Sequence, residues 1–221
     1  MIRELELMDV SGGFECQLFN YGSMRDTIGW FNYRFVPGIY VLKGEVGVGG
    51  WALSEILCGK AEISSGSVLL NGNPLGNNQL GNYGCCIGDI INVGLNNDVS
   101  KMTIHKQLEY AVENGLGYGK SVSEIKEMFE LSDGRFERTL PDTSGERWRI
   151  SMAVGYAFEK SIYCFPWVNS KFIKSLMCLE LCLKILKNSG SIIVIPTTFP
   201  ESLNEYVDDY TVVDLQDGVS E

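Results

Sequence analysis

The sequence predicts one α/β domain, spanning residues 1–221, in which helices cover a parallel β-sheet. Three observations support this fold class. The last third alternates buried strands with helices, which is the arrangement that parallel sheets require. Residues 39–59 run as a buried strand, a glycine-rich turn and an apolar-faced helix, and a helical insert occupies about 103–141. A chain of 221 residues can bury such a core without disulfides or metals.

Turn residues divide the first third of the chain into short strands. Pro-Gly, Ser-Gly and Asn-Gly pairs interrupt apolar runs, as expected for strands joined by turns. A polar passage rich in Gly and Asn, at 72–84, is expected to be a surface loop. The predicted strands are 14–21, 30–36, 39–44 and 67–72.

Helical periodicity begins at Thr103 and gives way to alternating elements. The apolar spacing predicts helices at 104–115 and 122–134, and a cap residue followed by an early glutamate predicts another helix from Ser144. Beyond it the pattern predicts strand 161–165, helix 171–190, strand 191–195, a short helix at 201–209 and strand 210–215. We expect the helical subdomain to span about 90–145 within the single domain.

Composition excludes several classes of function. Acidic residues number 28 against 18 basic ones, for a net charge of -10, whereas binders of nucleic acid or anionic membranes need a basic face. No apolar run reaches the ~18 residues of a membrane span, so direct membrane insertion is not expected. The seven cysteines form no CxxC pair and are interpreted as buried apolar residues in a reducing cytoplasm. The single histidine, His105, is expected on a helix surface, and no metal site is predicted.

The glycine-rich turn fits the start of the phosphate-binding pattern GxxxxGK[ST]. In that pattern backbone N–H groups at a helix N-terminus bind phosphate, a lysine contacts the outer phosphates, and a Ser or Thr hydroxyl binds magnesium. Here the lysine position holds Gly50 and the hydroxyl position holds Trp51. By itself the pattern is equally compatible with a tight strand-to-helix turn. The candidate anion-binding residues are Gly44, Glu45, Gly47, Val48, Gly49, Gly50 and Trp51.

Further motifs follow in an order that resembles the nucleotide-binding subunit of ATP-binding cassette (ABC) transporters. The resemblance covers about 14–219 and rests on a Pro-Gly turn before the loop, Gly59 after its helix, an SG-x-V-x-x-x-G hairpin, a segment similar to the LSGGQ signature, and a closing Asp-Gly. It implies a P-loop NTPase-like core with a small antiparallel β subdomain and a helical subdomain insert. These motifs lie at 37–38, 59, 65–72, 142–149 and 217–218.

The positions that carry chemistry in that family are replaced. Pro166 and Trp167 follow the strand that would end in a metal-binding aspartate and a water-activating glutamate. Thr198 stands at the switch histidine, Asp89 near the magnesium-sensing glutamine, and Ile173 at the aspartate of the following loop. Among the family's nucleotide-contacting side chains, only the aromatic residue that stacks on adenine has a counterpart, which is Tyr21.

These replacements predict that catalytic residues are absent and ATP hydrolysis is lost. A charge-assisted hydrogen bond is worth about 1.5–3 kcal/mol, so three independent losses weaken nucleotide binding by roughly three to six decades. Trp51 is expected either to fill the phosphate pocket or to turn into the core. No cofactor is expected, although the backbone of 44–49 leaves weak binding of ATP or phosphate open.

The signature-like segment is the part that the resemblance implies could act in trans, on a nucleotide bound by a partner subunit. Thr143, Ser144 and Gly145 supply a hydroxyl, a small residue and a glycine, and Glu146 replaces the glutamine. The alternative is a plain helix N-cap, in which a Ser or Thr precedes an early glutamate.

The function expected from this resemblance is a catalytically degenerate cassette subunit of a transporter. It would pair with an active ATPase subunit and with transmembrane permease subunits, in the cytoplasm at the inner face of the membrane. Two alternatives stay open. One is a working ATPase in which Lys43 or Lys60 reaches the phosphates; the other is a cytoplasmic scaffold or regulator derived from such a subunit.

Overall fold

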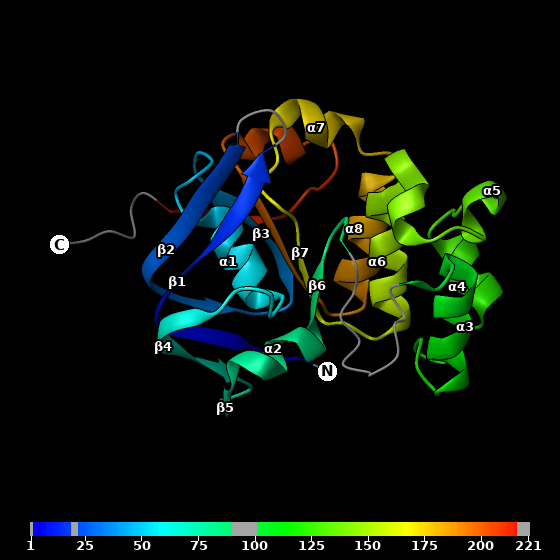
Figure 1. Ribbon diagram of the computed structural model, residues 1–221, viewed down its shortest axis with the longest axis horizontal. Coiled ribbons are helices and arrows are strands. Elements are labelled where there is room, and N and C mark those ends of the chain that lie inside the picture. The colour runs from blue at the N-terminus through cyan, green and yellow to red at the C-terminus, as the bar shows by residue number, and fades with distance from the viewer. Residues whose placement is uncertain (1, 19–21, 90–100, 216–221) are drawn as a thin grey trace.

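Two β-sheets and a helical region make up the protein, as the computed structural model shows (Figure 1). The structure describes residues 2–18, 22–89 and 101–215. Helix α1 (Gly50–Leu57) lies between the two sheets, and the other long helices lie on the far side of the parallel sheet. This arrangement confirms the predicted α/β class, with a parallel core and a smaller antiparallel sheet.

The parallel sheet carries the core of the molecule. Its three inner strands, which are β7 (Ile162–Cys164), β8 (Ile192–Thr197) and β3 (Gly38–Lys43), are buried along almost their whole length. This burial explains their continuous apolar sequences. Side chains on one face pack with α1, and those on the other pack with α6 (Arg147–Ala157) and α8 (Leu179–Asn188). In spatial order the strands are β6 (Gly84–Cys86), β7, β8, β3 and β9 (Thr211–Asp214).

The antiparallel sheet is larger than its sequence pattern predicts. Its first strand begins at Leu5, whereas the pattern predicts a strand only from residue 14. Asp9 and Trp30 have positive φ beside shifts in the β1–β2 register, and these bulges interrupt the alternation that marks a strand. The spatial order is β2 (Gly22–Phe35), β1 (Leu5–Leu18), β4 (Ile63–Leu70) and β5 (Asn73–Leu75).

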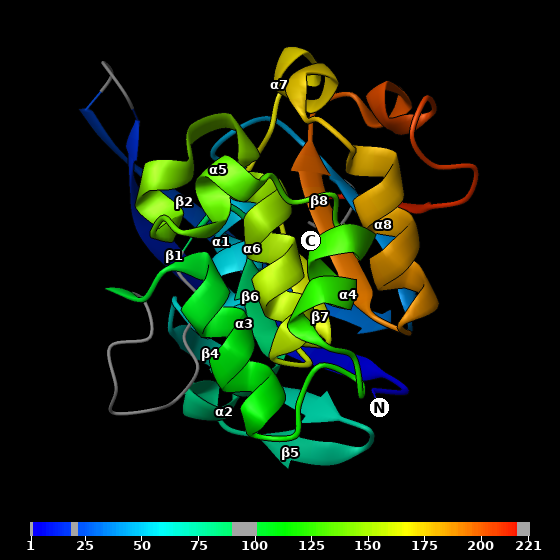
Figure 2. The same ribbon diagram turned by 90° about the vertical axis from the view of Figure 1, so that its right-hand side faces the viewer.

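The helical insert is confirmed and lies at one end of the molecule (Figure 1), the end that faces the viewer in Figure 2. Local capping fixes where its helices begin: Thr103 accepts the N–H of Lys106, and Ser121 forms a reciprocal capping box with Glu124. The insert consists of α3 (Ile104–Glu113), α4 (Val122–Met128) and α5 (Asp133–Phe136), and the 3₁₀ segment η2 (Leu140–Glu146) then leads into α6.

Three expectations about local structure are wrong. Residues 72–84 hold β5 and helix α2 (Asn77–Tyr83) instead of a loop. The helix expected at 171–190 is divided into α7 (Ser170–Ser175) and α8, because Leu176 is extended after the end of α7 and Cys178, left-handed with φ 58°, precedes α8. The expected helix 201–209 shortens to the 3₁₀ turn η3 (Pro200–Leu203).

Most of the described cysteines are buried, as expected. Cys86 and Cys164 are paired residues on β6 and β7, and Cys58 at the end of α1 lies within hydrogen-bonding reach of both thiols. Burial raises the pKa of the Cys58 and Cys164 thiols above the ordinary range. Cys178 is the described exception, because it is only half-buried. The side chain of Cys16 lies outside the described residues.

His105 occupies the surface of α3, as predicted, where it contacts the carboxylates of Glu109 and Glu137. Of the helices in the described part of the chain, none has the length and apolar character to cross a membrane.

Candidate functional site

The candidate phosphate loop lies at the carboxyl end of β3, the strand between β8 and β9. Its backbone requires glycine at two positions, because Gly47 and Gly49 have φ values of 95° and 98°. A Cβ on Gly49 would lie 2.6 Å from the carbonyl oxygen of Thr27 on β2. The strand–turn–helix unit predicted from the sequence is therefore present, and its loop is pressed closely against the antiparallel sheet.

Neighbouring side chains crowd the position at which the phosphate-loop pattern has lysine. A Cβ on Gly50 would lie 3.0 Å from Cβ of Pro196 and 3.2 Å from Cδ1 of Leu215. Both distances are shorter than ordinary van der Waals contacts, so even the first carbon of a longer side chain would displace its neighbours. A side chain at residue 50 would therefore require Pro196 and Leu215 to shift by a few tenths of an ångström.

Trp51 lies half-buried at the junction between α1 and the antiparallel sheet. Its ring centroid is 5.4 Å from that of Phe14 on β1, and its indole Nε1 donates to Oε1 of Glu55 at 3.2 Å. Burial raises the pKa of Glu55, while Lys60 and the Trp51 indole oppose that shift. The indole is therefore held by an aromatic contact and a hydrogen bond, and not fully enclosed in the core.

Sequence reasoning missed Asp26, a completely buried carboxylate on β2. Its Oδ1 accepts the N–H of Gly49 at 2.8 Å, and its Oδ2 accepts the N–H of Ala52 at 2.8 Å. A signal was available in the sequence, since Asp26 precedes Ile28 by two residues and strand periodicity places both on the same inward face. An acidic residue on such a face needs strong hydrogen-bond donors, and the loop supplies them.

Neutral groups from two other strand ends close over the first glycine of the loop. The Trp167 indole Nε1 donates to the Gly44 carbonyl oxygen at 3.0 Å. Thr198 Oγ1 lies 3.5 Å from the same oxygen and donates to Oε2 of Glu45 at 3.2 Å. Trp167 and Thr198, which the sequence resemblance places at acidic and histidine positions, are thus brought together at the loop, where they form hydrogen bonds within the chain.

Lys43 and Lys60, the two lysines that a working ATPase with substituted residues would use, are paired with carboxylates. Lys43 Nζ is 2.7 Å from Asp214 on the adjacent strand β9, and Lys60 Nζ is 2.5 Å from Asp89. Pro166 is half-buried beside Trp167, and Ile173 is buried on α7. Tyr21 and the closing Asp217-Gly218 lie outside the described residues. Within the described residues, no group of three or more His, Cys, Asp or Glu side chains is arranged to hold a metal ion.

The signature-like segment has a different construction. Thr143 is buried and its hydroxyl donates to the Leu140 carbonyl oxygen, whereas Ser144 and Gly145 are exposed. Ser144 has φ 48° and ψ -126°, a conformation that favours glycine. Helix α6 begins at Arg147, and no side chain caps its first turn, so the N-cap interpretation of this segment is wrong.

A network of ion pairs and hydrogen bonds from α5 and α6 holds the signature-like segment in place. Oε2 of Glu146 is 2.9 Å from Nη2 of Arg149 and 3.0 Å from the hydroxyl of Ser132, and the Arg135 guanidinium donates to the Thr143 carbonyl oxygen. Burial alone would raise the pKa of Glu146, but the hydrogen bonds from Arg149 and Ser132 outweigh it and the pKa is lowered. Glu146 is therefore a structural anchor of this turn.

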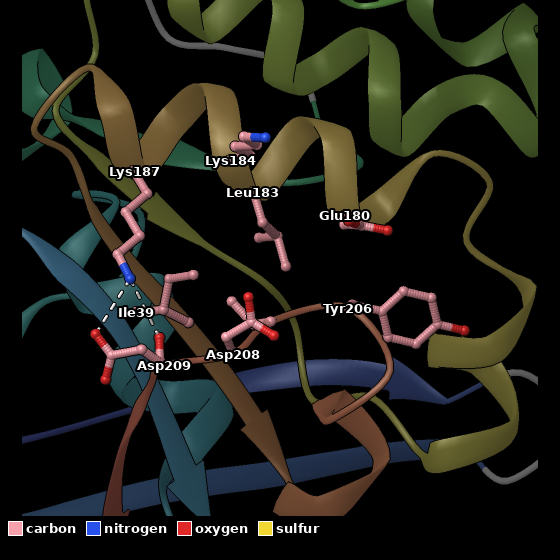
Figure 3. Close-up of a pocket in the computed structure, with 9 residues that line it drawn as sticks. Ile39, Glu180, Leu183, Lys184, Lys187, Tyr206, Asp208 and Asp209 are labelled. Carbon is pink, nitrogen blue, oxygen red and sulfur yellow. Dashed lines mark hydrogen bonds and ion pairs between the residues drawn. The ribbon is translucent and has the colours of Figure 1, made fainter.

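A separate pocket of about 200 Å³ lies at the opposite end of β3 from the glycine loop (Figure 3). It is formed by α8, Ile39 near the start of β3 and the segment 206–209. Lys187 Nζ pairs with Asp209 at 3.2 Å across one side of it. The pocket mixes charges of both signs, and none of the residues in the candidate loop lines it.

Solved structures with the same architecture are ATP-binding subunits of ABC transporters. A putative ABC transporter ATP-binding protein from Pyrococcus furiosus has a TM-score of 0.62 at 17% identity, covering 97% of this chain and 98% of that one. An ATP-binding subunit of an ABC transporter has a TM-score of 0.61 at 18% identity, covering 97% and 87%. The chain has the fold of an ABC transporter ATP-binding subunit.

A third structure, cbiO1 from Clostridium perfringens, has a TM-score of 0.59 at 15% identity and covers 96% of this chain and 85% of that one. It is described as part of the ABC transporter complex cbiONQ. No protein-family model matches the sequence, and no curated protein matches it. The likeness to these ABC subunits therefore resides in the fold.

Proposed function

We propose that this protein is a cassette subunit of an ABC transporter that does not hydrolyse ATP and that serves as the structural or regulatory partner of an active ATPase subunit and a membrane permease. The observation that carries the proposal is the packing at Gly50, where Pro196 and Leu215 crowd the site of the phosphate-binding lysine. The scaffold is kept, while the lysine is replaced by glycine and a side chain at this position would have to displace Pro196 and Leu215 by a few tenths of an ångström.

The groups around the loop do not fit Mg-ATP. Phosphoryl transfer depends on cations and a metal ion that neutralise charge on the phosphates. The loop offers Gly50 and Trp51 at the cation and metal positions, and Trp167 and Thr198 bind the loop itself through hydrogen bonds. Losing three charge-assisted contacts alone corresponds to roughly three to six decades of affinity. No nucleotide cofactor is therefore required in this proposal.

The pairing of both lysines argues against a working ATPase with substituted residues. Such an enzyme would need Lys43 or Lys60 at the phosphates. Each would first have to leave a carboxylate at 2.7 Å or 2.5 Å, respectively. An ammonium group that breaks one ion pair to form another gains little net free energy.

The signature-like segment supports a role beside a partner. Ser144 and Gly145 are exposed on a turn whose backbone is anchored by Glu146 and Arg149, so a small surface is presented on a fixed base. Docking to a permease would place the protein at the inner face of the membrane without inserting it. The assembly named for the Clostridium perfringens neighbour is a precedent for such a complex.

Isolation of the tagged full-length protein from its native cells in mild detergent tests this role. We expect it to co-purify with a cassette subunit that has an intact GxxxxGK[ST] loop and with a multi-span permease. Gly145→Trp adds bulk to the exposed turn and should remove the cassette partner. Gly29→Trp on β2 is the matched control, because a Cβ at either glycine meets nothing within 4 Å and Gly29 lies outside the signature-like segment and the residues that hold it.

Two results would contradict the proposal. One is a stable monomer that captures neither class of partner. The other is nucleotide hydrolysis by the purified chain alone that disappears in a Lys43→Met variant.

A further inference from the structure

We infer that the Asp26 carboxylate takes the place of a phosphate at the glycine loop, so that the chain carries its own anion at this site and excludes nucleotide phosphates. The inference rests on the proposed function in one respect, since it explains physically why a retained loop would bind no nucleotide. Its test is nevertheless independent of any transporter partner.

The contacts of Asp26 are those that a bound phosphate oxygen would make. Oδ1 and Oδ2 each accept a backbone N–H at 2.8 Å, the first from Gly49 in the loop and the second from Ala52 in the first turn of α1. Phosphate-binding loops use backbone N–H groups of this kind, at the start of a helix that follows a glycine turn. Two of the donors are therefore already satisfied within the chain.

The charge of Asp26 is balanced by the loop. The carboxylate is 0% exposed, and no residue within the described ranges forms an ion pair with it. A buried carboxylate in this situation depends on hydrogen bonds and on the positive end of the helix dipole. A second anion beside it would meet strong repulsion. At about 5 Å and an effective dielectric constant of about 20, that repulsion weakens binding by about two orders of magnitude.

The antiparallel sheet holds Asp26 in this place. Asp26 is paired with Phe14 in the β1–β2 register, and Phe14 in turn contacts the Trp51 ring. The next residue on β2, Thr27, has its carbonyl oxygen within 2.6 Å of the position a Gly49 Cβ would occupy. The carboxylate is thus fixed by strand pairing, by the close approach of β2 to the loop, and by its own two hydrogen bonds.

Calorimetric titration with inorganic pyrophosphate, without magnesium, tests the inference on the full chain. The wild type is expected to show no binding at millimolar ligand. Asp26→Ala removes the charge and frees both N–H groups, and it should bind at least tenfold more tightly than the wild type. Asp26→Asn keeps the shape and one acceptor, so its affinity should lie between the two. Asp133→Asn changes the net charge equally at a distant exposed position and should behave as the wild type.

Two outcomes would overturn the inference. The first is that the wild type, both Asp26 variants and the Asp133→Asn control all bind pyrophosphate with equal affinity. The second is that a folded Asp26→Ala variant does not bind pyrophosphate. Thermal unfolding establishes whether each variant is folded.

A measurement on the wild type covers the case in which the variants fail to fold. The amide resonances of Gly49 and Ala52 should be protected from hydrogen exchange and should not move with pyrophosphate. Ligand-dependent shifts of both would refute the internal anion. A chain that fails this test could still pair with a cassette partner, and a chain that passes could still fail to pair, so the two proposals can be separated.

Discussion

The glycine loop and the signature-like turn both preserve an unusual backbone, but they are stabilised in opposite ways. The loop is closed by contacts within the chain, from Asp26 to its N–H groups and from Trp167 to the Gly44 carbonyl oxygen. The signature-like turn is held by the ion pair between Glu146 and Arg149, and Ser144 within it is exposed. The polar groups of the glycine loop are thus satisfied within the chain, whereas the signature-like turn presents exposed residues to the solvent. This difference is the one that the proposed role requires, because a non-hydrolysing partner subunit would need an exposed turn but no open phosphate loop of its own.

The largest expected effect comes from substituting one glycine in each region by alanine. Gly49→Ala should lower the free energy of unfolding by about 3 kcal/mol or more, because φ is 98° and the new Cβ would lie 2.6 Å from the Thr27 carbonyl oxygen. Gly145→Ala should change it by less than about 0.5 kcal/mol, since a Cβ there meets nothing within 4 Å. Urea unfolding of both variants measures the contrast. Equal losses would show that the two regions are equally constrained.

The second prediction concerns the anchor beneath the turn. Glu146→Ala should cost about 2–3 kcal/mol, because the Arg149 side chain is only 8% exposed and would lose its carboxylate partner. The lowered pKa of Glu146 means that its contribution is present above the ordinary glutamate pKa and declines as pH falls through the folded-state pKa. The stability difference between the wild type and Glu146→Gln should therefore shrink in acid. A difference that stays constant down to low pH would contradict the ion-pair assignment.

A smaller effect, of opposite sign, is expected at the exposed serine. Ser144→Gly should raise the free energy of unfolding by about 1 kcal/mol, because Ser144 has φ 48° and ψ -126°. The neighbouring Asp142→Gly should lower it, since it adds backbone entropy and removes the hydrogen bond with Thr139. Thermal melts at one pH suffice. Destabilisation by Ser144→Gly would mean that the turn is not strained at this residue.

A further small effect is expected at Trp51, the second residue of α1. Trp51→Phe keeps an aromatic ring near Phe14 but loses the hydrogen bond to Glu55, so it should cost no more than about 1 kcal/mol. Trp51→Ala also loses the ring packing and should cost more. If the two variants are equally stable, the packing of the Trp51 ring on Phe14 contributes nothing to stability.

Periodicity predicted the parallel core well, because buried strands and helices with one apolar face leave strong patterns. It failed where a local feature interrupts the pattern. The bulge at Asp9 concealed the first half of β1, and the bulge at Trp30 concealed the part of β2 that precedes it. The extended Leu176 and the left-handed Cys178 divide what the spacing predicts as one helix. Short elements such as β5 and α2 lie in a polar passage where no apolar period can mark them.

The candidate site was predictable only in part. The loop and the missing lysine follow directly from the residues at 44–51, and the backbone there has the shape that those glycines permit. Asp26 contacts Gly49, which is 23 residues away in the sequence, and Trp167 contacts Gly44, which is 123 residues away. Local sequence carries little information about contacts between such distant positions. Strand periodicity offered one cue, the inward position of Asp26.

Three buried thiols lie where α1 meets the parallel sheet, and their reactivity can report on the opening of this contact. They belong to Cys58, Cys86 and Cys164. A neutral alkylating reagent can reach them only after α1 lifts away from β6 and β7, so their modification rate measures how often this helix separates from its sheet. Comparing that rate in the isolated chain and in the presence of the proposed cassette partner would show whether assembly slows the separation of α1 from the parallel sheet.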